Sequence, residues 1–276
     1  MIDKYCLLGE DVSSSPSPSM MNAAFAAVGI DASYEAISVA REEFRGRFLA
    51  LREAVKGFNL TMPYKSEVLP LLDSLDEVSL RIGAANVVKR SGSRLTGYNS
   101  DVSGITAPLR EHGKARIDSA LLLGAGGGAR AFCEAMDQLG CEQVTVAVRK
   151  MERGERFAAE MARIFPRIEF GAVAIEEIGP RKADLLFNAT PLGSTGHPLP
   201  DQVKRVIYGQ MTVFDAVYRP MKTELLRIAE ERGSPTIQGY EMLLNQGTLA
   251  FEIWTGRMAP KDSMRRALLE SLGARS

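Results

Sequence analysis

The sequence predicts an α/β fold, and the order of its segments is the main reason. Residues 120–123 form an apolar run, a glycine-rich loop follows, residues 129–139 continue at helical spacing, and residues 144–148 form a second, β-branched run. This is the strand–turn–helix–strand order of a parallel sheet. Strand-like and helix-like segments continue to alternate after it, and 276 residues are enough for two domains.

The segments before the glycine-rich loop follow from apolar spacing and helix-end signals. Ser17 is a favourable N-cap residue, Pro18 suits the first turn, and Gly29 suits the end of that helix. Pro63 should end the strand before it. The expected strands are 4–8, 33–39, 58–62 and a hairpin of 87–90 with 94–98. The expected helices are 17–28, 42–55, one that contains Lys65, Val68, Leu69 and Leu72, 75–82 and one starting near 101.

Similar spacing defines the segments after the loop. The run at 184–188 contains three consecutive apolar residues, Leu185–Phe187, as expected for a strand buried on both faces. A long apolar-periodic segment, 240–254, is predicted as a helix. The remaining expected strands are 168–173, 212–214 and 235–238, and the remaining helices are 157–164, 225–231 and a final one containing Met264, Leu268 and Leu272.

The glycine-rich loop predicts a dinucleotide site. Gly124 allows a tight turn, Gly126 lets the backbone approach a pyrophosphate, and Ala129 takes the third small position of a G-x-G-x-x-G/A pattern. Free N–H groups at the start of the following helix then face the phosphates. The alternative is an ordinary structural turn, but both strands and the helix are in place.

The end of the second strand indicates which dinucleotide is bound. NAD sites usually place an acidic residue there, whereas this chain has Val148 followed by Arg149, Lys150 and, further on, Arg153. Guanidinium groups suit a 2′-phosphate, which favours NADP. The alternative is a solvated basic helix start with nearby glutamates as partners.

Composition excludes several other functions. The formal net charge is zero, so neither nucleic acid nor an anionic membrane surface is an expected partner. The three cysteines lack metal or disulfide spacing, and with two histidines no metal site is expected. Neither a signal peptide nor a membrane-spanning run is recognisable, and a cytoplasmic enzyme is expected.

Polar residues gather at expected strand and helix ends. Ser15 and Ser17 beside a helix N-terminus could bind a carboxylate, although capping within a serine-rich loop is the simpler reading. Asn59 and Thr61 share one face at the end of the 58–62 strand, and Lys65 follows Pro63. The end of a strand is a usual position for a site in an α/β sheet, although a polar strand end with an exposed lysine is the simpler reading. Asp101 could cap its helix or face Lys65 across a cleft.

Seven motifs together resemble the shikimate dehydrogenase family, and the resemblance covers essentially the whole chain. Each motif is weak alone, but all seven occur in the family's order. They are S-x-S-P-S-x-M-N-A-A-F (15–25), N-x-T-x-P-x-K (59–65), G-A-x-N (83–86), G-x-N-[ST]-D (97–101), GAGGxxRA (124–131), N-A-T-P-x-G (188–193) and Q-G-x-x-x-F-x-x-W-T-G (246–256).

The resemblance implies two α/β domains, with a Rossmann NAD(P)-binding domain at 101–239 inserted into a substrate domain made of 1–100 and 240–276. It also implies reversible reduction of 3-dehydroshikimate to shikimate by NADPH, in aromatic amino-acid biosynthesis.

Site residues are implied in the same way. Lys65 would be catalytic and paired with Asp101, which also binds substrate. Ser15 and Ser17 would bind the ring carboxylate, and Tyr218 would close over the ring. Thr61, Asn86 and Gln246 would bind ring hydroxyls. The cofactor would be held by Gly124, Ala125, Gly126, Gly127 and Gly128 at the pyrophosphate, by Arg149, Lys150 and Arg153 at the 2′-phosphate, and by Asn188, Ala189, Thr190, Pro191, Ala216 and Gly239 at the nicotinamide side.

Four departures from the family pattern leave alternatives open. Val148 and Lys150 replace two hydrogen-bonding residues, so NADP and NAD both remain possible cofactors. Val102 stands where a glycine usually follows the motif aspartate and could shift the helix start. Glu241 replaces a small residue and could repel phosphate or alter closure.

The alternatives in function are a quinate/shikimate dehydrogenase, or a paralogue acting on a related cyclohexene carboxylate. A dinucleotide-sensing protein that has lost catalysis is a third, but it would be expected to lack Lys65 or Asp101, and both are present. Monomer and homodimer are both compatible with the sequence.

Overall fold

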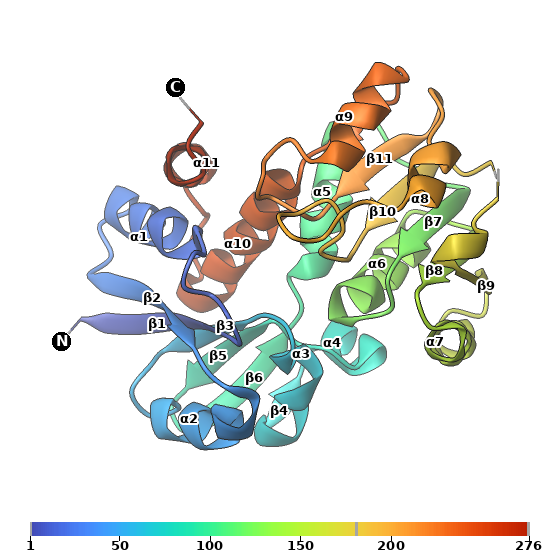
Figure 1. The fold of residues 1–276 in the computed structure, drawn as a ribbon. Helices are drawn as coiled ribbons and strands as arrows, with labels where there is room; N and C mark the ends of the chain where they lie inside the picture. Colours follow the sequence, from blue (N-terminus) through green and yellow to red (C-terminus); the bar gives the residue numbers. More distant parts are fainter. Residues whose placement is uncertain (1, 180–181, 275–276) are drawn as a thin grey trace. The chain divides into compact units, whose positions relative to one another are not determined.

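The computed structural model describes residues 2–179 and 182–274 (Figure 1). The chain divides into two compact units, one of residues 1–104 with 243–276 and the other of residues 105–242. The divisions fall inside two helices, α5 (Asp101–Glu111) and α10 (Gly239–Thr255). They differ by three or four residues from the inserted segment expected from the sequence, 101–239, so Asp101 belongs with the first unit.

The first unit contains a mixed six-stranded sheet in the order β2-β1-β3-β5-β6-β4 (Figure 1). Neighbours β2, β1 and β3 are parallel, and β5 and β6 form the expected antiparallel hairpin. The strands are β1 (Asp3–Gly9), β2 (Ala32–Ser38), β3 (Gly57–Leu60), β4 (Ser74–Leu75), β5 (Val87–Ser91) and β6 (Arg94–Tyr98). The helices are α1 (Ser17–Ala27), α2 (Phe44–Leu51), α3 (Tyr64–Glu67), α4 (Glu77–Ile82) and α11 (Lys261–Ser271), with 3-10 turns at Arg41–Glu43 and Leu69–Leu71.

Alternation along β1 explains how both faces of this sheet are covered. Cys6 and Leu8 point into a core with Phe48 of α2. Tyr5 points to the opposite face, where its ring contacts Phe25 of α1 (5.0 Å between centroids) and Trp254 of α10 (4.9 Å). Helices therefore cover both faces of the sheet. The packing holds the ends of its strands in place, and the polar residues expected in the site follow those ends.

The second unit contains a six-stranded sheet in the order β12-β11-β10-β7-β8-β9, in which every neighbouring pair is parallel. The strands are β7 (Ser119–Leu123), β8 (Gln143–Val148), β9 (Glu169–Ala174), β10 (Leu185–Asn188), β11 (Thr212–Asp215) and β12 (Thr236–Ile237). The helices are α6 (Gly127–Gln138), α7 (Met151–Ile164), α8 (Asp201–Val206) and α9 (Glu224–Glu231), with a 3-10 turn at Ile175–Glu177.

Both faces of the parallel sheet are buried, as its apolar strands require. On one face Leu121 and Val213 belong to a core with Val203 of α8 and Leu225 of α9. On the other face Phe187 of β10 stacks on Phe132 of α6, and Phe214 of β11 meets Phe187 edge-on, with centroids 4.7 and 5.1 Å apart. The glycine-rich loop therefore connects a fully buried strand to a packed helix.

Several expected element boundaries were wrong. Ser17 is the first residue of α1 and not its cap, and its N–H donates to the Ser15 hydroxyl (3.3 Å). The helix expected at 42–55 is shorter, and the one expected at 157–164 begins at Met151. Helix α4 starts after Asp76, whose carboxylate accepts from the Ser79 N–H (2.8 Å) and so caps it. Helix α8 was not expected from the sequence. In the described part of the chain, no helix has the length and apolar character needed to cross a membrane.

We expect Gly57→Ala to destabilise the protein by about 1–3 kcal/mol, because a Cβ at this position would overlap the Trp254 indole and lie 2.8 Å from the Val88 carbonyl oxygen. The matched control is Gly46→Ala in α2, where a Cβ meets no atom within 4 Å. Since alanine is the better helix former, that variant should gain about 0.5–1 kcal/mol. Urea unfolding of both variants checks this, and equal midpoints would contradict it.

Candidate active site

The charged pair expected from the sequence is formed inside the first unit. The Lys65 ammonium donates to Asp101 Oδ2 at 2.5 Å, and the two side chains are 17% and 5% exposed. Lys65 lies in the short helix α3 just after β3, and Asp101 is the first residue of α5. A strand end and a helix start thus bring the two groups together although they are 36 residues apart.

Asn86 and its neighbours fix the position of Asp101. Asn86 Nδ2 donates to Asp101 Oδ1 (2.8 Å) and to Ser100 Oγ (3.1 Å), and Asn86 Oδ1 accepts from the Ser100 N–H (2.7 Å). Asn99 Oδ1 accepts from the Asp101 N–H (3.0 Å). Each Asp101 carboxylate oxygen therefore has a donor from a different element, one from α3 and one from the loop before β5.

Other residues expected to bind substrate lie in the same unit. Gln246 Oε1 accepts from the Ser100 hydroxyl (3.4 Å), which links α10 to the Asn86 network. Thr61 follows β3, and its N–H donates to the Leu8 carbonyl at the end of β1 (3.0 Å). Ser15 and Ser17 contact each other at the start of α1, and no described hydrogen bond joins them or Thr61 to Lys65. Most of these expected residues follow the carboxyl ends of β1 and β3, and Gln246 comes from α10.

The glycine-rich loop of the second unit lies where the strand order reverses, between β7 and β10. This switch point is the usual nucleotide position in an open α/β sheet. Gly124 has a φ of +102°, and a Cβ there would lie 2.7 Å from the Thr190 side chain. Nothing lies within 4 Å of a Cβ at Gly126, which begins α6 as its N-cap. No neighbouring atom therefore crowds the backbone at Gly126, and Gly124 lies against Ala189 and Thr190.

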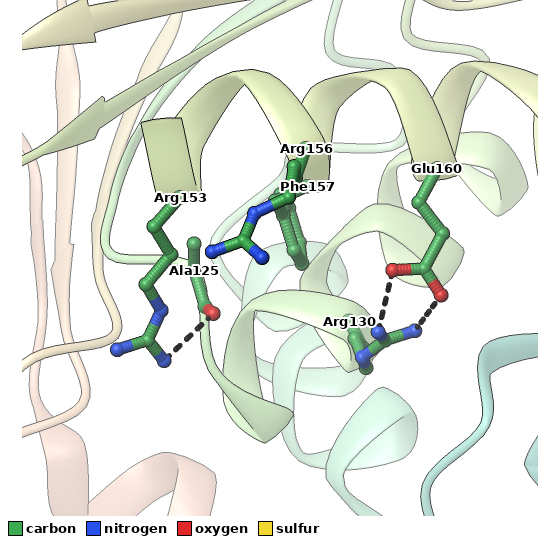
Figure 2. Close-up of a pocket in the computed structure, with 6 residues that line it drawn as sticks. All are labelled: Ala125, Arg130, Arg153, Arg156, Phe157 and Glu160. Atoms are coloured by element: carbon green, nitrogen blue, oxygen red, sulfur yellow. Dashed lines mark hydrogen bonds and ion pairs between the residues drawn. The ribbon is translucent and has the colours of Figure 1, made fainter. Parts of the chain in front are cut away.

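The end of β8 is followed by the basic residues expected from the sequence, and one of them lines a pocket. A pocket of about 270 Å³ is lined by Ala125, Arg130, Arg153, Arg156, Phe157 and Glu160 (Figure 2). Arg153 is among these residues, and its guanidinium donates to the Ala125 carbonyl (3.1 Å). Arg149 and Lys150 are exposed and do not line this pocket.

Asn188 and Asp215 order the strand ends expected on the nicotinamide side. Asn188 Nδ2 donates to Asp215 Oδ1 (2.9 Å) and Thr190 donates to Asn188 Oδ1 (2.6 Å). Asp215 also accepts from the Thr223 hydroxyl (2.6 Å) and the Val217 N–H (3.0 Å). Burial raises the pKa of the Asp215 carboxyl to about 6, and these donors oppose that rise.

Ala216, Gly239 and Tyr218 adjoin that network. A Cβ on Gly239 would overlap the carbonyl groups of Ala216 and Val217, so the start of α10 can lie against this segment only as glycine. The Tyr218 side chain is partly buried, and burial raises the pKa of its hydroxyl. Ala189 and Pro191 belong to the loop beside Gly124.

Two departures from the family pattern have a local explanation. Val102 is buried in the first turn of α5, which still begins at Asp101, so the helix start is not shifted. Glu241 Oε1 accepts from the Gln238 N–H (2.9 Å), and Oε2 is 2.8 Å from His112 Nε2. Both carboxylate oxygens are thus engaged at the first turn of α10, in the manner of a capping box.

The sequence pattern did not identify several of these residues. Three of them, Asn99, Ser100 and Arg130, stand in the family motifs but have no role assigned from the sequence. The others, Asp215, Arg156, Phe157 and Glu160, stand outside those motifs and belong to the second polar network or to the pocket. The available signal for Asp215 was a carboxylate at the end of a buried strand, and for Arg156 a further cation three residues after Arg153. Among the described residues, no group of three or more His, Cys, Asp or Glu side chains could hold a metal ion.

Comparisons with known proteins agree with the family resemblance of the sequence motifs. The shikimate dehydrogenase substrate binding domain matches residues 7–88, and the shikimate 5′-dehydrogenase C-terminal domain matches residues 239–269. The chain is 34% identical to a shikimate dehydrogenase (NADP(+)) of Nitrosopumilus maritimus, over 96% of this chain and 97% of that one.

Solved structures are similar over nearly the whole chain. Shikimate 5-dehydrogenase from Thermus thermophilus, in complex with NADP(H) and shikimate, has a TM-score of 0.86 at 35% identity, over 98% of this chain and 100% of that chain. Quinate dehydrogenase from Corynebacterium glutamicum, in complex with NAD, has a TM-score of 0.88 at 30% identity, over 98% and 99%.

The fold and its two groups of residues define a dinucleotide-dependent oxidoreductase with a Rossmann-type parallel sheet. Relatives that share more than 30% of their residues over nearly the full length establish the family. The chain belongs to the shikimate dehydrogenase family.

The raised pKa of Asp215 predicts a pH effect on stability. Because the folded pKa of about 6 exceeds the ordinary 3.8, the folded state binds the proton more tightly, and stability should fall as pH rises from about 4 to 6. Relative to Asp215→Asn, which does not titrate, the wild-type free energy of unfolding should drop by roughly 3 kcal/mol across this range. Urea unfolding at several pH values tests this, and parallel pH profiles for the two proteins would contradict it.

Proposed function

We propose that this chain catalyses the reversible reduction of 3-dehydroshikimate to shikimate with NADPH, as a step of aromatic amino-acid biosynthesis. The observation that carries the proposal is the shielded Lys65–Asp101 pair, which places a proton-donating ammonium at a strand end, where α/β enzymes usually hold substrate. The family relationship supports the substrate, since relatives across nearly the full length are shikimate dehydrogenases.

Lys65 is the proton donor in this proposal. When a ring carbonyl is reduced, negative charge develops on its oxygen, and the Lys65 ammonium stabilises that charge and donates a proton to it. Asp101 holds the ammonium in place through Oδ2, while Asn86 holds Asp101 through Oδ1. The catalytic lysine is therefore oriented before substrate binds.

The remaining polar residues of the first unit recognise the ring. Ser15 and Ser17 bind a ring carboxylate, and their position at the start of α1, where helix N–H groups favour an anion, supports this role. Thr61, Asn86, Asp101 and Gln246 offer hydroxyl, amide and carboxylate groups that suit ring hydroxyls. Tyr218 is a further residue that the family resemblance assigns to substrate binding.

The second unit fits the dinucleotide. NADPH supplies the hydride when it is bound. Gly124–Gly128 hold the pyrophosphate at the start of α6, because Gly126 carries no side chain and the α6 N–H groups are not yet paired within the helix. Arg153 binds the 2′-phosphate from the pocket rim, and Arg149 and Lys150 add positive charge nearby. Asn188–Pro191, Ala216 and Gly239 line the nicotinamide side.

Initial rates of shikimate oxidation, with NADP⁺ and NAD⁺ in parallel and quinate as a second substrate, test the proposal. We expect turnover of shikimate with a clear preference for NADP⁺. Activity mainly with NAD⁺ or quinate would instead support the second candidate, a quinate/shikimate dehydrogenase. That candidate is favoured by the apolar Val148 and by the similarity to the NAD-bound quinate dehydrogenase.

Lys65→Ala should lower kcat by about 10²–10⁴-fold, the usual contribution of a general acid–base residue. Binding of NADPH, measured by its fluorescence, should stay close to wild type because Lys65 lies in the other unit from the glycine-rich loop. Lys56→Ala is the matched control, since this lysine is half-exposed and pairs only loosely with Asp3 (3.7 Å). Wild-type turnover by Lys65→Ala would exclude Lys65 as the proton donor.

A further inference from the structure

The pocket between α6 and α7 contains two arginines, Arg130 and Arg156, that were not among the residues expected to bind the 2′-phosphate. Three of its lining residues are arginines, Arg130, Arg153 and Arg156, and one is a carboxylate, Glu160 (Figure 2). Since a phosphate monoester carries close to two negative charges at pH 7, the distribution of these four charges decides how well it binds.

Arg130 and Glu160 neutralise each other on one side of the pocket. Arg130 donates from both terminal nitrogens to the two Glu160 oxygens, at 2.8 and 2.7 Å, and its guanidinium lies 6.0 Å from the Phe157 ring centroid. Such a bidentate pair is strong and fixes both side chains. Glu160 is thereby prevented from repelling an anion, and Arg130 has little charge left to offer one.

Arg153 and Arg156 supply the remaining positive charge. Arg153 is anchored to the glycine-rich loop by its bond to the Ala125 carbonyl. Arg156 Nε donates to the Glu152 carbonyl of its own helix (3.4 Å), and the nearest Glu152 carboxylate oxygen is 3.9 Å from its terminal nitrogen. The Arg156 guanidinium points between Arg153 and the Arg130–Glu160 pair, and no bond to another lining residue is drawn to it (Figure 2).

We propose that Arg156 is a specificity-determining residue of this chain, which binds the 2′-phosphate of NADP together with Arg153. Two guanidinium groups of α7, one bonded to the glycine-rich loop and the other to its own helix, provide the charge and hydrogen-bond donors that a dianionic phosphate requires. The buried Val148 at the end of β8 offers neither a carboxylate for a ribose hydroxyl nor a donor for phosphate. The inference rests on the proposed use of NADP and names a residue that the sequence motif did not include.

Binding of adenosine 2′,5′-bisphosphate and of adenosine 5′-monophosphate, measured by calorimetry on the whole protein without shikimate, tests the proposal. We expect Arg156→Gln to weaken the bisphosphate about tenfold, the size of one lost charge-assisted hydrogen bond, and to leave the monophosphate nearly unchanged. Arg163→Gln is the matched control, because Arg163 is exposed on the same helix and does not line the pocket.

The outcomes separate this inference from the proposed function. If the wild-type protein binds both nucleotides equally, the preference for NADP itself fails. If the wild type prefers the bisphosphate and Arg156→Gln keeps that preference, or loses both ligands equally, the role of Arg156 is overturned. A loss confined to the bisphosphate, with Arg163→Gln unchanged, supports it.

Discussion

The ion pair between Lys65 and Asp101 is the interaction on which the polar half of the first unit depends. Removing a carboxylate and an ammonium from water costs several kcal/mol per ion, which their attraction offsets only when the other hydrogen bonds are satisfied. Asn86 provides the second donor to Asp101, and Ser100 and Asn99 hold Asn86 and the helix start in turn. The pairing of β3, β5 and β6 therefore brings Asn86 and Asp101 together, in addition to aligning the core residues of these strands.

In the second unit, the corresponding constraint is the reversal of strand order between β7 and β10. A reversal of this kind is the usual nucleotide position in an open α/β sheet, and two glycines lie close to neighbouring backbone or side chains near these strand ends. Gly124 meets Thr190 there, and Gly239 meets the Ala216–Val217 backbone. Asp215 and Asn188 keep both strand ends in place by bonding to each other. The two glycines allow close backbone contacts, and the Asn188–Asp215 hydrogen bond fixes the carboxyl ends of β10 and β11.

Much of this was predictable because the decisive signals are local. Apolar periodicity identified most strands and helices, and the position of Lys65 and Asp101 at element ends indicated that they could meet. Other features depend on tertiary context. Arg156 reads as a solvated helix residue, because its place in a pocket depends on α6 packing beside α7. The burial of Asp215 depends on neighbours from β10 and Thr223, and α8 has too few residues for helical periodicity to be recognisable.

Glu241 shows why a departure from a family pattern needs its local partners before it is interpreted. From sequence, a carboxylate near a phosphate-binding edge suggests repulsion. In the structure, its two oxygens face the Gln238 N–H and His112, so it stabilises the first turn of α10. The same reasoning applies to Glu160, whose negative charge is matched by Arg130. Glu241 and Glu160 are both paired with local partners. Because Arg130 neutralises Glu160, the guanidinium groups of Arg153 and Arg156 remain the main source of positive charge for an anion in this pocket.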